Sequence, residues 1–176
     1  LLPSALFDLS LIAAYDERIY GELAETFELT ATPVKSFQVH AIQAQDKWIN
    51  ALMQKYFNES TASGIHGLFL QNAAKSSNLS IDIHCFETKA FIGIYRENKI
   101  WYADFSSFEA IDDIVYTTLN AIQHFNFQEQ DGILRLSSSH STLQEDTMLA
   151  TFERLAFFDR FTMSTGYLES LLSPFE

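Results

Sequence analysis

The stretch LSIDIHCFETKAFIGIYRENKIWYADF, residues 79–105, contains three segments in which apolar and polar residues alternate. Alternation with a period of two indicates β-strands, because successive side chains of a strand point to opposite faces of a sheet. We expect strands at 79–85, 91–95 and 100–105, the first with one buried face. Only short polar turns separate them, so the three strands should form an antiparallel meander.

The residues that follow predict helices and further strands. A capping-box pattern at Ser106 and Glu109 is expected to open a helix with an apolar stripe over 111–125. The remaining elements are a strand, a helix and a strand, at 133–136, 143–157 and 158–163. A strand, a crossing helix and a second strand require a right-handed parallel crossover. The expected order β-β-β-α-β-α-β therefore describes an α/β fold, a mixed sheet with helices.

The first part of the chain predicts a less regular arrangement. Residues 19–27 have the pattern of a helix, and residues 37–42 alternate like a half-buried strand. Asp46 is placed to cap a helix that runs to Phe57. The apolar face of that helix consists of Trp48, Ile49, Leu52, Met53 and Tyr56.

A short strand at 65–68 and a short helix at 68–75 are expected next. The polar run 75–78 is the best boundary in the chain. We therefore expect two lobes, residues 1–78 and residues 79–176.

Composition and charge exclude several classes of protein. The 176 residues are 47% apolar, enough to bury a core, and the single cysteine excludes an intramolecular disulfide framework and a four-cysteine zinc site. Acidic residues outnumber basic residues 23 to 11, which gives a net charge of −12. Such a surface repels phosphate backbones and anionic lipids, so we expect neither a nucleic-acid nor a membrane partner. The free Cys85 and the lack of a signal-peptide pattern favour the cytoplasm.

Several segments together resemble a known family. They are LPSALFD at 2–8, VHAI at 39–42, GIH at 64–66, IDDIVY at 111–116 with its continuation to Gln123, and ILRLS at 133–137. With the element order, the chain resembles the ribonuclease-H-like lobes of the actin, sugar-kinase and heat-shock-chaperone superfamily. It looks most like an uncharacterised bacterial family with an actin-like ATPase fold, distantly similar to pilus-assembly actin-like proteins.

The resemblance implies a domain layout. Residues 1–78 would be the C-terminal portion of a first actin-like lobe, and residues 79–176 a second ribonuclease-H-like lobe. A strand meander of the first lobe would then precede Leu1, so the first lobe is expected to be incomplete.

The resemblance also implies a place for a nucleotide. Active members of the superfamily grip phosphate with an Asp and a Gly in the turn between the first two strands of each lobe, because backbone amides approach phosphate best without a Cβ. The matching stretch here keeps Asp82, but no Gly occurs between Leu79 and Ile92. His84 and Glu87 lie where phosphate would lie, and Glu87 would repel it.

A second nucleotide contact in that superfamily is a Gly-Gly pair at a strand end, which lies against the adenosine. The matching stretch here is Ser137-Ser138-Ser139-His140. The resemblance thus implies at most a vestigial nucleotide site, formed by Asp82, His84, Ser137 and Ser138.

Other groupings carry alternative hypotheses. His40 and His66 could bind a metal or move a proton together, although a structural role for each is the simpler interpretation. Asp82, His84 and Cys85 suggest a Cys–His nucleophile, but neighbouring strand residues point to opposite faces, which favours a buried and inert thiol. Asp112 and Asp113 are explained by the dipole of a helix first turn.

Two further groupings involve residues of the three expected strands of the meander. Trp101 and Tyr102 should project to opposite faces. One of them could join Tyr95 or Phe91 in an exposed aromatic patch, although simple burial under a helix is the favoured interpretation. Asp82 and Asp104 could form part of a two-metal hydrolase site.

The function expected from these observations is that of a non-catalytic, degenerate actin-like-fold protein. It would act as an interaction or scaffold module, with an unknown protein partner or by self-association, and would need no cofactor. The alternative is an ATP-binding switch that takes ATP with Mg²⁺. A ribonuclease-H-like hydrolase is a third hypothesis.

Overall fold

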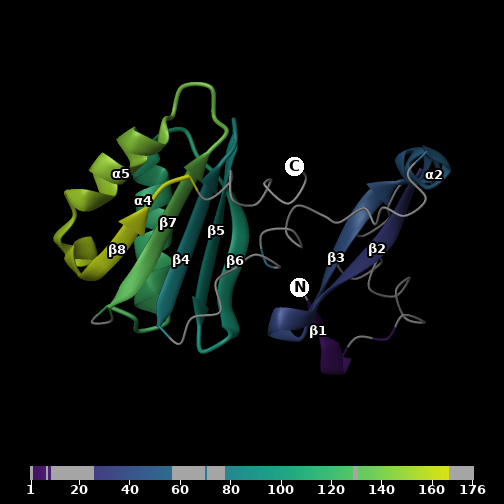
Figure 1. The fold of residues 1–176 in the computed structure, drawn as a ribbon, viewed down its shortest axis with the longest axis horizontal. Helices are drawn as coiled ribbons and strands as arrows, with labels where there is room; N and C mark the ends of the chain where they lie inside the picture. Colours follow the sequence, from purple (N-terminus) through teal and green to yellow (C-terminus); the bar gives the residue numbers. More distant parts are fainter. Residues whose placement is uncertain are drawn as a thin grey trace. The chain divides into compact units, whose positions relative to one another are not determined.

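The computed structural model describes residues 2–6, 8, 26–56, 70, 78–128 and 131–166. The chain divides into two compact units, Leu1–Asn72 and Ala73–Glu176 (Figure 1). Among the described residues, no helix has both the length and the apolar character needed to cross a membrane. Each unit is built around its own sheet.

The first unit contains a three-stranded antiparallel sheet in the order β1-β3-β2. Its strands are β1 (Leu2–Pro3), β2 (Phe27–Val34) and β3 (Val39–Asp46). A 3-10 turn, η1 (Ser4–Leu6), follows β1, and η3 (Lys35–Phe37) joins β2 to β3. The hairpin of β2 and β3 is long, with paired residues from Phe27 and Asp46 to Val34 and Val39. A helix, α2 (Lys47–Tyr56), follows β3.

The sequence predictions for this unit are partly wrong. Phe27 begins a strand rather than ending a helix, and the expected strand at 37–42 runs instead from Val39 to Asp46. The cap is confirmed, since the Oδ1 atom of Asp46 accepts a hydrogen bond of 3.1 Å from the backbone nitrogen of Trp48. Leu70 is helical and fully buried, while the rest of the elements expected at 65–75 lies outside the described residues.

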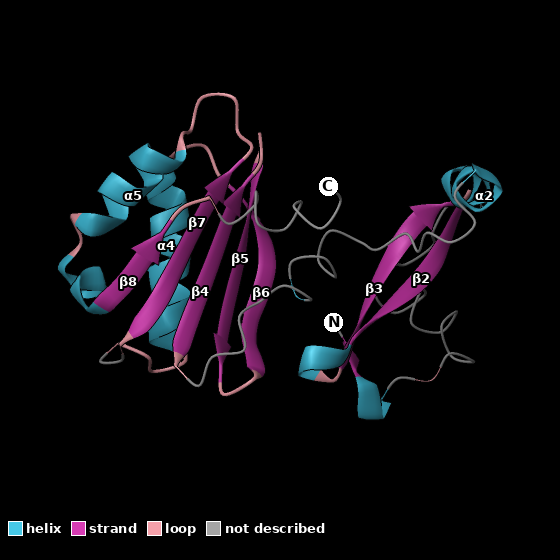
Figure 2. Ribbon diagram, in the orientation of Figure 1, coloured by secondary structure: helices cyan, strands magenta, loops and turns pink. Residues whose placement is uncertain are grey.

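The second unit contains a five-stranded mixed sheet in the order β6-β5-β4-β7-β8 (Figure 2). Its strands are β4 (Leu79–Cys85), β5 (Lys89–Arg96), β6 (Lys99–Ser107), β7 (Gly132–Ser138) and β8 (Phe161–Ser164). Its helices are α4 (Ile111–His124), α5 (Glu145–Glu153) and the 3-10 helix η4 (Ala156–Arg160). The meander β4-β5-β6 is antiparallel, and β4, β7 and β8 are parallel, which confirms the predicted α/β fold and its element order.

The core of this unit lies between the sheet and its two α-helices. Ile81 and Ile83 of β4 belong to the same buried cluster as Ile122 of α4 and Phe152 of α5. The stripe predicted for α4 is confirmed at its centre, where Ile114, Val115 and Ile122 are buried. Burial of these aliphatic side chains is the main stabilising contribution to the unit.

The central strand β4 differs from its prediction in one respect. The alternating pattern predicted one buried face, yet all seven residues of β4 are buried. The polar members Ser80, Asp82 and His84 are at most 2% exposed. We call the face on which they lie the polar face of the sheet. A polar side chain in such a position requires partners within the protein, and the partners of Asp82 and His84 define the candidate site described below.

Two helix boundaries also differ. Ser106 is still part of β6, and α4 begins at Ile111, so the capping box predicted from Ser106 and Glu109 is wrong. The Oδ2 atom of Asp113 caps the helix instead, accepting hydrogen bonds from the backbone nitrogens of Glu109 (2.9 Å) and Ala110 (3.0 Å), which lower the pKa of Asp113. The helix expected at 143–157 is shorter and gives way to η4, and the last strand begins at Phe161.

Candidate functional site

The predicted nucleotide-site residues lie on two neighbouring parallel strands, near their carboxyl ends. In the register of β4 and β7, His84 is opposite Ser137 and Cys85 is opposite Ser138. Asp82 lies two residues before His84 on the same face of β4, opposite Arg135. The carboxyl ends of parallel strands are where α/β sheets commonly bind ligands. The structure therefore brings His84, Ser137 and Ser138 together and places Asp82 toward the middle of the strand.

His84 is held by serine hydroxyls on both ring nitrogens. Its Nδ1 atom is 2.7 Å from the Oγ of Ser137, and its Nε2 atom is 3.3 Å from the Oγ of Ser139. The ring of Phe86 packs edge-on against the imidazole, with the ring centroids 4.4 Å apart. Burial lowers the pKa of His84 to about 4, so the imidazole is neutral at pH 7. One ring nitrogen then donates a hydrogen bond and the other accepts one.

Ser138 anchors the loop between β7 and α5. Its hydroxyl donates to the carbonyl oxygen of Leu143 (2.6 Å) and accepts from the backbone nitrogen of His140 (3.1 Å). Its own backbone nitrogen donates to Oε1 of Glu145 (3.1 Å), and Oε2 of Glu145 accepts from Gly166 (2.8 Å). The serine thus has a structural role, because each of its polar groups bonds to the surrounding loop or to Glu145.

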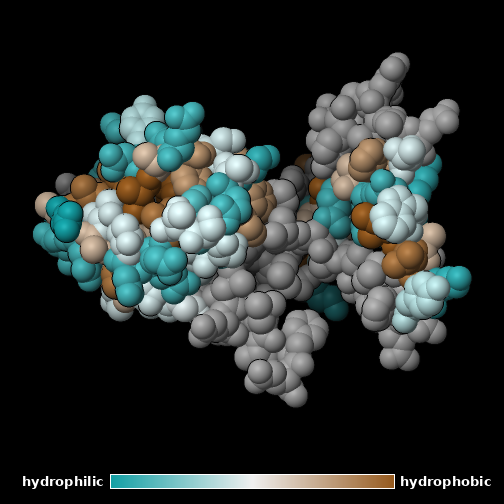
Figure 3. Space-filling view, turned by 90° about the horizontal axis from the view of Figure 1, so that it is seen from above, coloured by the Kyte–Doolittle hydropathy of each residue, from teal (hydrophilic) through white to brown (hydrophobic). Residues whose placement is uncertain are grey.

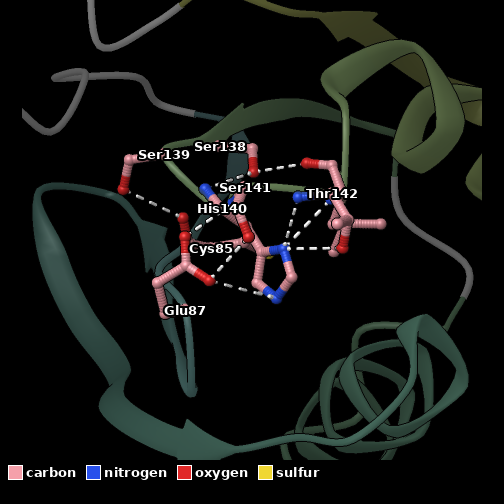
Figure 4. Close-up of polar contacts among 8 residues, drawn as sticks. Cys85, Glu87, Ser138, Ser139, His140, Ser141 and Thr142 are labelled. Atoms are coloured by element: carbon pink, nitrogen blue, oxygen red, sulfur yellow. Dashed lines mark hydrogen bonds and ion pairs between the residues drawn. The ribbon is translucent and has the colours of Figure 1, made fainter.

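A carboxylate from the β4–β5 turn joins this loop (Figure 4). Glu87 accepts hydrogen bonds from the backbone nitrogen (2.7 Å) and the hydroxyl (2.9 Å) of Ser141, and these bonds lower the pKa of Glu87. The Nε2 atom of His140 is 4.0 Å from the same carboxylate. We call Glu87, Ser138, Ser141 and Glu145 the loop clamp, since Glu145 holds the start of the loop at Ser138 and Glu87 holds its middle at Ser141.

His140 contributes to this arrangement in a way that the sequence did not predict. Its side chain is only 17% exposed. Its Nδ1 atom accepts hydrogen bonds from the backbone nitrogens of Thr142 (3.1 Å) and Leu143 (3.0 Å). The partner of Ser141 is 54 residues away along the chain, so no local sequence pattern could have identified the clamp.

Asp82 forms a buried ion pair with Arg135. The Oδ1 atom of Asp82 is 2.5 Å from Nη2 and 2.6 Å from Nε of Arg135, and the two side chains are only 3% and 13% exposed. Burial raises the pKa of Asp82 to about 6, and the positive charge of Arg135 opposes that rise. Asp82 is therefore committed to a cation of the protein itself.

ATP with Mg²⁺ is the ligand that the resemblance implies, and the residues present do not fit it. A phosphate needs backbone donors, but the nitrogens of Ser138 and Ser141 already donate to Glu145 and Glu87. A carboxylate at that place also repels a phosphate. Among the described residues, no group of three or more His, Cys, Asp and Glu side chains has a metal-binding arrangement. The loop clamp thus fills the donor positions with the protein's own anions.

The hydrolase hypothesis is contradicted by the strand register. Asp82 is opposite Gly93, and Gly93 is opposite Ala103, so these three residues share one face of the sheet. Asp104 follows Ala103 and points to the other face. The two carboxylates therefore cannot bind the same metal ion.

The remaining groupings do not form a second site within the described part of the chain. Cys85 is fully buried in the apolar core, on the face opposite His84, and burial raises its thiol pKa to about 12, as expected for an inert cysteine. His40 lies in β3, whereas His66 falls outside the described residues. Asp112 and Asp113 occupy the first turn of α4 as predicted.

The exposed aromatic patch considered as an alternative for β6 does not form with Phe91 or Tyr95. Phe91 and Tyr95 are at most 2% exposed, so neither can contribute to an exposed patch. An irregularity in the pairing of β5 with β6 places Tyr95 opposite Ile100 and Ile94 opposite Tyr102. Trp101 lies between these pairs, and its ring packs edge-on against Phe125 (5.8 Å) and Phe127 (5.2 Å) after α4. A bulge therefore turns Trp101 toward rings of its own unit.

Comparisons with known proteins identify the fold. No protein-family model matches the sequence, and no curated protein matches it significantly. A solved structure from Bacteroides thetaiotaomicron, of a protein with an actin-like ATPase fold and unknown function, is similar, with a TM-score of 0.72 and 14% sequence identity. The match covers 98% of this chain and 68% of that protein. The chain thus has an actin-like ATPase fold, which confirms the predicted fold class and the resemblance at the level of the fold.

Proposed function

We propose that this chain is a non-catalytic protein of the actin-like fold that works as a protein-interaction module. The proposal includes a cytoplasmic location, supported by the buried free thiol of Cys85. It also includes a bacterial source, supported by the similar structure from Bacteroides thetaiotaomicron. Fold alone does not imply function, so the argument depends on the residues at the strand ends.

The observation that carries the proposal is the double acceptance by Glu87 from Ser141. The turn between β4 and β5 is where the superfamily holds phosphate, and here it presents a carboxylate whose acceptors are engaged by the opposite loop. The neutral, serine-bound His84 and the ion-paired Asp82 are likewise committed to intramolecular contacts. A site whose loop nitrogens and carboxylates already bond to one another has little to gain from binding a nucleotide.

An ATP-binding switch is the second candidate, and the fold itself is the observation that favours it. The two candidates differ in a simple measurement, thermal unfolding of the full chain with and without millimolar Mg-ATP. A ligand at 100 times its dissociation constant adds about 2.7 kcal/mol, which raises the unfolding temperature by several degrees.

We expect no shift with Mg-ATP beyond the shift that Mg²⁺ alone produces. The matched variant is Glu87→Gly, which removes the carboxylate and restores a glycine to the turn. A shift for the native chain would overturn the proposal and support the switch. A shift confined to the variant would instead show that Glu87 is what excludes the nucleotide.

A further inference from the structure

The imidazole of His140 accepts hydrogen bonds from the backbone of its own loop. Its Nδ1 atom receives the N–H groups of Thr142 (3.1 Å) and Leu143 (3.0 Å), and the hydroxyl of Thr142 lies 3.3 Å from the same atom. His140 and Thr142 are drawn together in Figure 4. A ring nitrogen that accepts carries no proton, so the neutral ring holds its proton on Nε2. The two backbone donors thus assign the tautomer of His140.

The other side of the ring faces a carboxylate. The Nε2 atom of His140 lies 4.0 Å from Oε2 of Glu87, which comes from the turn between β4 and β5. Phe108, between β6 and α4, contacts the ring with the centroids 5.7 Å apart and carries no charge. Thr142 and Leu143 are uncharged as well, so Glu87 is the charged group that faces the ring among the described residues. The ring therefore lies between two backbone donors and an anion.

A second proton on the ring changes its hydrogen bonds. The imidazolium is a donor at both nitrogens, and a backbone N–H group cannot accept. The new Nδ1–H would point at the N–H groups of Thr142 and Leu143, so both of those bonds are lost. The hydroxyl of Thr142 can reverse its role and accept, which keeps a single contact. At Nε2 the positive charge strengthens the attraction to Glu87, so protonation favours the carboxylate over the loop backbone.

The loop is accessible to solvent. Ser141 and Thr142 are exposed, and the side chain of His140 is 17% exposed. Figure 3 views the second unit from the end on which this loop lies in Figure 1, and hydrophilic residues are open there. A proton from solvent can therefore reach the ring.

We propose that His140 is a pH-sensitive switch of the loop between β7 and α5. Its neutral ring holds the backbone of Thr142 and Leu143, and its protonated ring releases them and pairs with Glu87. Histidine is the side chain whose charge most often changes between pH 5 and pH 8. The switch does not depend on the proposed function, since its parts are contacts of one loop with itself and with Glu87.

The release is confined to a short part of the loop. The backbone nitrogens of Ser138 and Ser141 donate to Glu145 and Glu87, and neither bond involves the imidazole. Glu87 stays ionised in mild acid, because its hydrogen bonds with Ser141 lower its pKa. The loop clamp therefore persists while residues 140–143 are released.

The test is nitrogen-15 NMR of the full chain between pH 8 and pH 5. At pH 8 we expect the Nε2-protonated tautomer and through-hydrogen-bond couplings between Nδ1 of His140 and the amide nitrogens of Thr142 and Leu143. These couplings should vanish as the ring takes up its second proton. The hydrogen-exchange protection factors of both amides should fall by about 10-fold in step, the size expected for one lost hydrogen bond. The amide of Ser139, which bonds to the carbonyl oxygen of Cys85 (2.9 Å), is the internal control and should keep its protection.

Two variants separate the proton on His140 from the change of pH itself. His140→Asn keeps a side-chain acceptor for the N–H group two residues on, as in an Asx turn, and it does not titrate. It should keep the protection of the Thr142 amide at both pH values. His140→Ala has no acceptor, so the same amide should be unprotected at both.

Several results would overturn the proposal. One is an Nδ1-protonated ring at pH 8, and another is a ring that is still neutral at pH 5. A third is a protonated ring whose couplings and protection factors persist. An equal loss of protection in the native chain and in His140→Asn would assign the release to another group and overturn the proposal as well. None of these results affects the measurement with Mg-ATP, so the proposed function is tested separately.

Discussion

The carboxylate of Glu87 accepts two hydrogen bonds from Ser141, one from its backbone nitrogen at 2.7 Å and one from its hydroxyl at 2.9 Å. The contact joins the turn after β4 to the loop after β7. It requires an ionised carboxylate for its full strength, since charge-assisted hydrogen bonds are stronger than neutral ones.

We predict that Glu87→Gln lowers the unfolding temperature at pH 7 and has a smaller effect in acid. The pKa of folded Glu87 lies below its ordinary value of 4.5, so its carboxylate stabilises the folded state above that pH and loses this effect as the pH falls through the folded pKa. Thermal unfolding of both proteins from pH 7 to pH 3 tests this. The exposed Glu109→Gln is the control, and a pH-independent difference for Glu87→Gln would contradict the prediction.

His84 is expected to stay neutral well into the acid range. Burial lowers its pKa to about 4, so the neutral form is favoured by folding. Its contribution to the free energy of unfolding is complete above the unfolded pKa of 6.5 and is lost as the pH falls toward 4. Between pH 6.5 and pH 4, the free energy of unfolding of the native chain should fall by on the order of 3 kcal/mol more than that of His84→Gln.

The measurement is a nitrogen-15 NMR titration of the imidazoles, in which His84→Gln identifies the signal. The His84 nitrogens should show the neutral pattern at pH 5. A protonated His84 at that pH would contradict both the predicted pKa and the buried contacts with Ser137 and Ser139.

The Asp82–Arg135 pair predicts a second pH dependence. Arg135→Leu leaves the carboxylate of Asp82 buried without its cation. We therefore expect the free energy of unfolding at pH 8 to fall by about 3–5 kcal/mol. This destabilisation should be smaller at pH 5. The pKa of Asp82 is about 6 with Arg135 present and rises further without it, so the carboxyl group is neutral at pH 5 in the variant.

Urea unfolding at the two pH values measures this difference. Arg154→Leu, at the exposed end of α5, is the control and should change stability little at either pH. An equal loss for Arg135→Leu at pH 5 and pH 8 would show that the cost comes from packing rather than from charge.

Gly93 makes room for Tyr95. A Cβ atom at position 93 would lie 2.1 Å from the hydroxyl oxygen of Tyr95 and 2.6 Å from Cζ, and Tyr95 is buried. Gly93→Ala should therefore destabilise the chain by about 1–3 kcal/mol through overpacking. In a Tyr95→Leu background, Gly93→Ala should lower the free energy of unfolding by a smaller amount. A double-mutant cycle that shows no coupling between the two positions would refute the steric explanation.

Much of the second unit was predictable from local patterns. The alternation at Leu79, Ile81 and Ile83 placed β4, and the stripe from Ile111 to Ile122 placed α4, because periodicity records which side of an element is buried. Boundaries were less accurate. Asp113, rather than Ser106, caps α4, since several polar residues near the helix start could serve and tertiary context selected one of them.

The candidate site was predictable in its members but not in its contacts. The sequence pointed to both His84 and Ser137, and the crossover made their strands parallel. The register that pairs the two residues is set in the folded sheet. The sequence did not predict that Glu87 meets Ser141, or that His140 turns back onto its own loop. Those contacts join residues far apart in the sequence or depend on a loop conformation, and neither leaves a periodic signal.

The sequence alone determined the order of the strands and helices in the second unit, the single buried thiol and the lack of phosphate-binding glycines between Leu79 and Ile92. These are properties of residue type and spacing, which act locally. Only the tertiary structure decided that both faces of β4 are buried, that Asp82 and Asp104 point apart, and that Trp48 lies open on α2. Each of these depends on which surfaces meet in the folded chain, and a side chain's own sequence neighbours do not specify that.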